Sequence, residues 1–417
     1  MILEASEWNL SIVEEHFEEL QSLWLRRLVA IESREWFESD IRKLDARIAA
    51  HADSLVLSFE HALAFFLENL QGEQEQVFSA AFPLSYIAST ESIELIFSKL
   101  EGASLSGMNG FADALSHAEH YPEWTKKHGL VKSASLPVAG VVAYALAMHG
   151  MLQSVENIVE MLLKSSEASE NVRGWTILNH VRQAKLRPEY IEQAWAHEDP
   201  SVGIAATNAA IWTKQPWFES FCLAQCHQSS NHRLSAGKAL SIIGRSSHAD
   251  TIKSILLDEA LGPQRIEFAS AFGHPSLLPM LVELMCSSDP QVASASMGEF
   301  QRMTNLDIES ETREKVLSSN QIASELENDF ADEVIMPDVD KAKQRMKDHM
   351  SEWSSFARLH RGISAETESE VVGSSNADLA AQMEATMRMA FSGSANVTYA
   401  SRIQTRGRWV IGRLSAR

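Results

Sequence analysis

The chain has 417 residues, 45% of them hydrophobic and 22% charged, and a formal net charge of −20. So acidic a balance argues against a nucleic-acid-binding protein, because neutralising phosphates takes clustered lysine and arginine. We find no apolar run long enough to cross a membrane, no basic and apolar secretory signal, and too few cysteines for a disulfide framework, so we expect a cytoplasmic protein.

Residues 1–70 are predicted to form an N-terminal helical cap. The stretch from Leu23 to Leu70 has the pattern of a long helix or a helix pair and lacks the start signals of the later repeats. Repeat arrays need such atypical ends, since the apolar face of the terminal repeat is otherwise left in water.

Residues 71–308 are predicted to form HEAT-like helical hairpin repeats. Strand patterns are poor, whereas helix starts recur roughly every 30 residues. In most repeats a helix rich in alanine, glycine and serine precedes a bulkier amphipathic helix. This alternation predicts an all-α fold, namely an α-solenoid. The starts lie near Glu73, Ser104, Ser135, Ser169, Asp199, Asn231, Gly262 and Asp289.

Two of these starts share the same residues. Asp199 and Asp289 are each followed by proline and, two residues after that proline, by valine. Aspartate is a good N-cap, and proline suits the first helical position, where no N–H is needed. We therefore interpret both aspartates as helix caps and not as catalytic carboxylates.

The C-terminal quarter differs from the repeats. Residues 309–340 are predicted to be a solvated acidic linker, and residues 341–417 a C-terminal helical segment that contains a methionine-rich helix at Leu379–Phe391 and ends in a basic tail. The acidic residues of the linker are Glu325, Glu327, Asp329, Asp332, Glu333, Asp338 and Asp340, and the arginines of the tail are Arg402, Arg406, Arg408, Arg413 and Arg417.

No cluster of residues has the pattern of a catalytic, cofactor or metal site. Cys222, Cys226 and His227 lack the second pair of ligands that structural zinc needs, so buried, inert cysteines are expected. His117 and His120 are not in the order of a zinc-protease helix, and His197-Glu198 is a single pair. Glycine-rich phosphate loops and nucleophile elbows are absent from the sequence.

Four tryptophans on repeat helices have two interpretations. They either fill the layers between helices or, if exposed, anchor a protein partner. They are the candidate partner-binding residues Trp175, Trp195, Trp212 and Trp217.

Several stretches resemble an uncharacterised bacterial family of HEAT-like proteins. They are "LWLRRLVAI" near the start, "LDARIAAHADSL" (Leu44–Leu55), "GEQEQVFSAAF" (Gly72–Phe82) and the segment Gly273–Ile308, which ends near a "TG-x-D"-like Thr304–Asp307. The chain departs from the family in the arginine that follows Asp-Pro-x-Val, which is replaced by Gly203 and kept only as Arg173.

Genes of that family typically lie in bacterial type VI secretion clusters, often near spike proteins. The resemblance therefore implies an accessory role in secretion. Because solenoids expose long continuous surfaces without a deep pocket, we expect a non-enzymatic scaffold or adaptor that engages a spike or effector protein. Two alternatives stay open: an immunity protein that binds a cognate toxin, and a HEAT-scaffold enzyme that depends on metal or nucleic acid.

Overall fold

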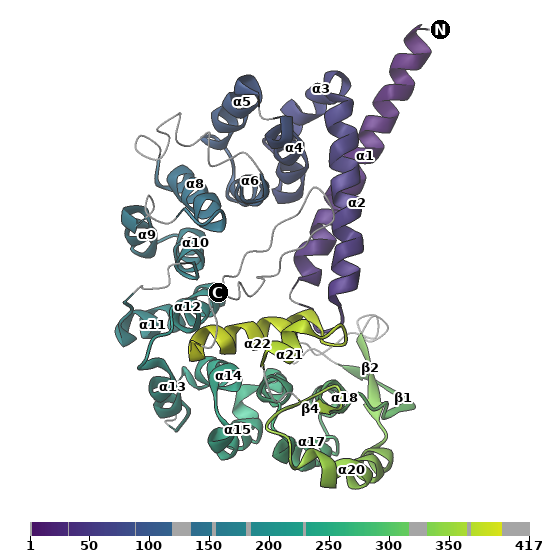
Figure 1. Cartoon of the computed structure of the whole chain (residues 1–417), viewed down its shortest axis with the longest axis vertical. Helices are drawn as coiled ribbons and strands as arrows, with labels where there is room; N and C mark the ends of the chain where they lie inside the picture. Colours follow the sequence, from purple (N-terminus) through teal and green to yellow (C-terminus); the bar gives the residue numbers. More distant parts are fainter. Residues whose placement is uncertain are drawn as a thin grey trace, which may run out of the picture. The chain divides into compact units, whose positions relative to one another are not determined.

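The structure, a computed structural model, is mainly helical (Figure 1). This confirms the all-α prediction. The residues described are 2–31, 33–87, 89–118, 135–151, 156–180, 185–227, 231–316, 332–364 and 368–393. None of the described helices is long and apolar enough to cross a membrane.

The chain divides into two compact units. The first contains residues up to Gln215 together with Asp378–Ala380, and the second contains Pro216–Ala377 with Ala381–Phe391. This division falls inside the segment 71–308, which was predicted to be one solenoid domain. Each unit is described by itself below.

The first unit begins with three helices within residues 1–70. Helix α1 packs against α2 and α3, and both α1 and α2 pack against the first repeat helix, α4. Phe17, Leu20 and Trp24 are buried on α1 at helical spacing, so one face of this long helix joins the core. The bounds are α1 Ile2–Ala30, α2 Glu38–Leu57, α3 Phe59–Asn69 and α4 Gln74–Ile87.

Small-residue helices then pack one after another. Helices α4, α6, α8, α10 and α12 each contact the next in that order, and α5, α9 and α11 pack against them. The close approach depends on glycine: a Cβ atom on Gly110 of α6 would lie 2.3 Å from the carbonyl oxygen of Gln74. The bounds are α5 Thr90–Leu100, α6 Leu105–His117, α8 Leu136–Met148, α9 Glu156–Leu163, α10 Ala168–Leu178, α11 Pro188–Trp195 and α12 Pro200–Trp212.

The two Asp-Pro sequences are helix caps, as predicted. The Asp199 carboxylate accepts the backbone N–H of Ser201 at 2.9 Å, and the Asp289 carboxylate accepts that of Gln291 at the same distance. In both cases proline occupies the first helical position. The two residues therefore have the same structural role, one in each unit.

The second unit continues with shorter helices joined by 3-10 turns. Their bounds are α13 Phe218–His227, α14 Arg233–Ile243, η3 Ser246–His248, α15 Ala249–Leu256, η4 Glu259–Leu261, η5 Pro263–Glu267, α16 Phe268–Phe272, η6 Pro275–Leu277, α17 Leu278–Leu284 and α18 Pro290–Thr304.

The prediction of a solvated linker at 309–340 is wrong for the residues that the structure describes. Strand β1 (Glu309–Val316) pairs antiparallel with β2 (Asp332–Pro337), and both contact α18. Helix α20 (Val339–Trp353) then starts at the N-cap Asp338. The side chains of β1 are mostly exposed and charged, so they show no apolar alternation, and the backbone ladder alone makes this segment a strand. Glu325, Glu327 and Asp329 lie outside the described residues.

The described part of 341–417 packs largely into the second unit and is not a separate segment. A tight hairpin joins β3 (Leu359–His360) to β4 (Ile363–Ser364) through Arg361 and Gly362, both at positive φ. The N–H of Gly362 donates to the Met303 carbonyl oxygen at 2.8 Å, and the N–H of Leu359 donates to the Gly273 carbonyl oxygen at 2.7 Å. Helices α21 (Glu368–Gly373) and α22 (Leu379–Ser392) follow, and α22 is the predicted methionine-rich helix. The five arginines of the basic tail lie outside the described residues.

Candidate functional site

Two of the four predicted tryptophan anchors are buried. Trp175 is 4% exposed and Trp212 is 7% exposed, so neither ring reaches the surface of its helix layer. This corrects the interpretation of both as partner-binding residues, because a ring that fills the core has no face left for a partner. Both rings instead fill the layers between helices, which was the other interpretation of the sequence.

The other two tryptophans are partly exposed. The Trp195 indole donates to the Thr207 hydroxyl at 2.8 Å, which fastens α11 to α12. The Trp217 ring lies edge-on to Phe218 and Phe221, with ring centroids 5.8 and 5.6 Å apart. Both keep some accessible surface and stay candidates, one in each unit.

The cysteines on α13 are buried in apolar surroundings, as predicted. Burial raises the pKa of Cys226 to about 12 and that of Cys222 well above its ordinary value. A thiol must lose its proton to act as a nucleophile or metal ligand, so neither is prepared for that chemistry. In the part of the chain that the structure describes, no three His, Cys, Asp or Glu residues are grouped to hold a metal ion.

Two histidines that the sequence singled out have structural contacts. His117 Nδ1 lies 2.7 Å from the Asp113 carbonyl oxygen, so this nitrogen carries the proton. His197 Nδ1 accepts the backbone N–H of Asp199 at 3.0 Å in the turn before α12. His120 lies outside the described residues.

The most strongly perturbed carboxyl in the first unit lies between α1 and α2. Arg27 Nε donates to Asp45 Oδ1 at 2.9 Å, and both side chains are almost fully buried. Burial raises the pKa of Asp45 to about 7, although Arg27 acts in the opposite direction. The Arg27 guanidinium also lies over the Trp24 ring, 5.1 Å from its centroid. With no exposed face, the pair is a structural ion pair and not a substrate site.

Asp113, on α6, is a second perturbed carboxyl. It accepts the Gln74 amide at 2.8 Å and is only partly buried by surface area. Desolvation nevertheless raises its pKa to about 6, and hydrogen bonds from Gln74 and Trp24 oppose that rise. A carboxyl with this pKa exchanges its proton near neutral pH, but no described nucleophile lies in hydrogen-bond contact with it.

Arg173 connects α10 to α6, the helix that carries Asp113. Its Nη2 donates to Asn109 Oδ1 at 2.9 Å, so a side chain of α10 reaches α6 beside α8. It directly follows Val172 on this helix. The structure gives it a role within the array, because it ties together helices that are not consecutive.

A surface that the sequence did not identify runs along α10 and α12. Gly174 faces Leu162 and Leu163 of α9, and Gly203 faces Trp195 of α11, so those helices cover one side of α10 and α12 (Figure 1). On other sides, partly exposed residues recur every three or four positions. We call this the uncovered face of α10 and α12. Its residues are Ser169, Val172, Thr176, Asn179, Ser201, Ile204 and Asn208.

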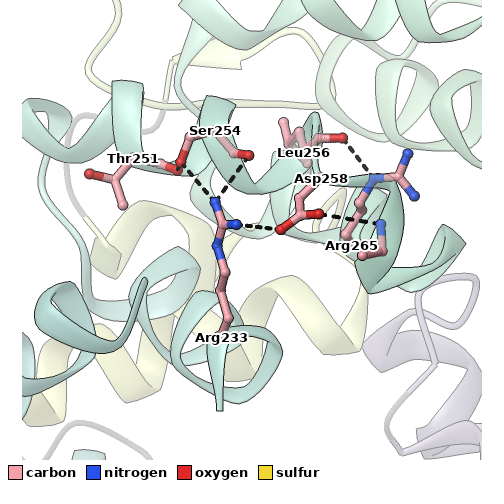
Figure 2. Close-up of polar contacts among 7 residues, drawn as sticks. Arg233, Thr251, Ser254, Leu256, Asp258 and Arg265 are labelled. Carbon is pink, nitrogen blue, oxygen red and sulfur yellow. Dashed lines mark hydrogen bonds and ion pairs between the residues drawn. The ribbon is translucent and has the colours of Figure 1, made fainter. Parts of the chain in front are cut away.

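Two arginines of the second unit, Arg233 and Arg265, bind carbonyl oxygens near the end of helix α15. Figure 2 shows Arg233 reaching the Asp258 carboxylate and the Ser254 backbone, where its Nη2 lies 3.4 Å from the carbonyl oxygen. In the same view the buried Arg265 donates to the Leu256 carbonyl at 2.8 Å. Unpaired carbonyls at the end of α15 are thus satisfied by guanidinium donors. This cluster closes a helix end and has no features of a binding site.

Comparison with known proteins gives no relative from which to assign these residues. No protein-family model matches the chain, and the search of curated proteins finds no match.

Proposed function

We propose that the chain is a non-enzymatic protein-binding scaffold that acts in the cytoplasm as an accessory protein of bacterial type VI secretion. Its partner is a spike or effector component. The observation that carries the binding role is the uncovered face of α10 and α12. The secretion role rests on the family resemblance of the sequence alone.

Three features of the first unit support a binding role. Helices α10 and α12 pack against each other, so their partly exposed positions lie on neighbouring helices. Ile204 is 47% exposed at the centre of its stripe on α12 and offers apolar contact area. The perturbed carboxyls Asp45 and Asp113 make contacts within the unit, which accounts for them without a reaction.

The test is co-purification of the full chain with the spike and effector proteins of one secretion cluster. We expect a complex that survives size-exclusion chromatography. Ile204→Arg should weaken it by about tenfold or more, because a charge replaces an apolar contact.

Met161→Arg on α9 is the matched control. Met161 is 55% exposed and lies in the same unit, on a helix that covers the other side of α10, so this variant should bind as the wild type does. Failure of every secretion component to bind the wild type rejects the secretion role. An equal loss in both variants rejects the uncovered face as the binding surface.

A further inference from the structure

A second surface of the first unit has the features of a peptide-binding site. The end of α1, the segment 33–37 and the first half of α2 enclose an open groove of about 380 Å³. Its lining residues are Arg26, Glu35, Trp36, Asp40, Lys43, Leu44 and Arg47, so it holds three cations and two carboxylates. None of them was predicted to be a binding residue from the sequence, and they come from three different segments of the chain.

Arg26 is the central side chain of the groove. It is exposed, and its guanidinium lies over the Trp36 ring, 5.0 Å from the ring centroid. In the part of the chain that the structure describes, no carboxylate pairs with it. A guanidinium stacked on an aromatic ring keeps its in-plane donors free, and these donors match the two oxygens of a carboxylate.

The other two cations of the groove are only weakly engaged. Lys43 pairs with Asp40 at 3.3 Å and Arg47 pairs with Glu19 at 3.0 Å, and both pairs are exposed to solvent. Exposed ion pairs contribute little to stability, so a carboxylate from another molecule can replace the present partner at little cost.

Apolar surface adjoins these charges. Leu25 is 46% exposed and Val29 is 76% exposed, and they flank Arg26 on α1. Val29 lies three residues after Arg26, so the two side chains are neighbours on the helix surface. The Trp36 ring adds an aromatic wall to the groove, and arginine and tryptophan are the residue types most often found at interface hot spots.

The segment that carries Trp36 is held in place before any partner binds. The N–H of Leu379 donates to the Trp36 carbonyl at 2.9 Å, and that of Ala380 donates to the Ser33 carbonyl at 3.3 Å. Phe37 forms a β-bridge with Asp378. A preformed site loses less conformational entropy on binding than a mobile loop does.

We propose that this groove binds an acidic segment of a partner protein in which an apolar side chain lies next to a carboxylate. The carboxylate pairs with Arg26, and the apolar side chain packs on Trp36 and Val29. The inference rests on the proposed binding function and adds the chemistry of the partner. In a chain of net charge −20, the three cations and two carboxylates of the groove leave it locally positive by one charge. Arg26 is the cation of the groove that has no carboxylate partner among the described residues, so it is the group that selects for a carboxylate at short range.

The test uses fluorescein-labelled dodecapeptides of leucine, phenylalanine and glutamate, with matched sets in which glutamine or lysine replaces glutamate. Fluorescence anisotropy against the full chain should show the glutamate set binding about tenfold tighter than the glutamine set and tighter still than the lysine set. Arg26→Gln should abolish that preference, and Trp36→Leu should weaken all sets.

Arg42→Gln is the matched control, because Arg42 is an exposed arginine of α2 that pairs with Glu38 and does not line the groove. It should keep the full preference. Equal binding of all three sets by the wild type, or an equal loss of preference in Arg26→Gln and Arg42→Gln, overturns the proposal. So does a dimer of the wild type that Arg26→Gln dissociates while no peptide binds, since the occupant is then a second copy.

These outcomes are distinct from failure of the proposed function. If secretion components co-purify with the wild type and with Arg26→Gln alike, and the peptides show no preference, the groove proposal fails and the scaffold stands. If the peptides bind as expected and no secretion component co-purifies, the secretion role fails and the groove stands.

Discussion

The core between α1 and α2 and the corner around α15 and η5 both bury an arginine, but they satisfy it with different acceptors. Arg27 is paired with a carboxylate, Asp45, inside the first unit. Arg265 donates to the carbonyl oxygens of Leu256 and Gly262 in the second unit, at 2.8 and 2.6 Å. Carbonyls do not titrate, whereas a carboxylate does, so the first region ties its stability to pH and the second does not.

The comparison also shows what each arginine stabilises. Arg27 holds two long helices together across a sequence separation of 18 residues, and loss of its partner leaves a buried charge. Arg265 is nine residues from Leu256 and closes the end of one helix. The first contact therefore contributes to tertiary packing, and the second to local structure.

The largest expected effect is that of Asp45→Ala. It strands the buried Arg27 charge and should lower the free energy of unfolding of the first unit by about 3–5 kcal/mol. Urea denaturation at pH 8, with hydrogen exchange to locate the loss, measures it. The control Asp40→Ala removes an exposed pair and should change stability by about 0.5 kcal/mol or less. A loss below about 1 kcal/mol for Asp45→Ala contradicts a buried charged pair.

Arg265→Met tests the other side of the comparison. It removes the donors of two carbonyls and should cost about 2–3 kcal/mol, with faster hydrogen exchange confined to the second unit. The loss should be the same at pH 6 and pH 8, because the acceptors do not titrate. Arg245→Met is the control, since that arginine is exposed and pairs with Glu219. A pH-dependent loss for Arg265→Met removes the distinction between the two regions.

Helix packing extends the comparison to two glycines. Gly110→Ala places a Cβ atom 2.3 Å from the Gln74 carbonyl oxygen and should cost about 1–3 kcal/mol in the first unit. Gly298, on α18 of the second unit, has open space around the Cβ position, so Gly298→Ala should stabilise by about 0.5–1 kcal/mol. Thermal unfolding of both variants measures this difference. If both are stabilising, α4 and α6 are not in close contact.

The last expected effect is the pH dependence that Asp113 contributes. Its pKa in the folded chain is about 6, above the ordinary value of 3.8, so the folded state binds the proton more tightly than the unfolded state. Stability therefore falls as pH rises from about 4 to about 6 and is level above that window. Asp113→Asn removes this dependence, so the variant should gain up to about 3 kcal/mol relative to the wild type across that window, at about 1.4 kcal/mol per pKa unit.

Urea midpoints at pH 4.5, 5.5 and 7 measure the gain. Asp45 also makes stability fall as pH rises, and it does so up to a higher pH, because burial raises its pKa to about 7. His180 acts in the opposite direction, since burial lowers its pKa to about 4 and acid costs stability. The contributions of Asp45 and His180 are the same in the variant and the wild type, so they cancel when the two proteins are compared. A gain that shrinks as pH rises contradicts the raised pKa of Asp113.

Most helices and their starts were predictable from the sequence. Asp199 and Asp289 cap helices as expected, and the small-residue helices from α4 to α12 follow the predicted repeats. The candidate surfaces were less predictable. Trp175 and Trp212 were proposed as anchors and are buried, while the groove around Arg26 and Trp36 had no pattern that marked it.

The sequence by itself determined the helical class, the caps and the spacing of apolar residues, because the hydrogen bonds and side-chain neighbours of a helix come from residues within four positions. Only the tertiary structure decided which face of each helix is covered. Arg26 and Arg27 are consecutive on α1, yet one is exposed over Trp36 and the other is buried against Asp45. The tertiary structure also decided the pairing of β1 with β2, because the hydrogen bonds of this pair join residues far apart in the chain.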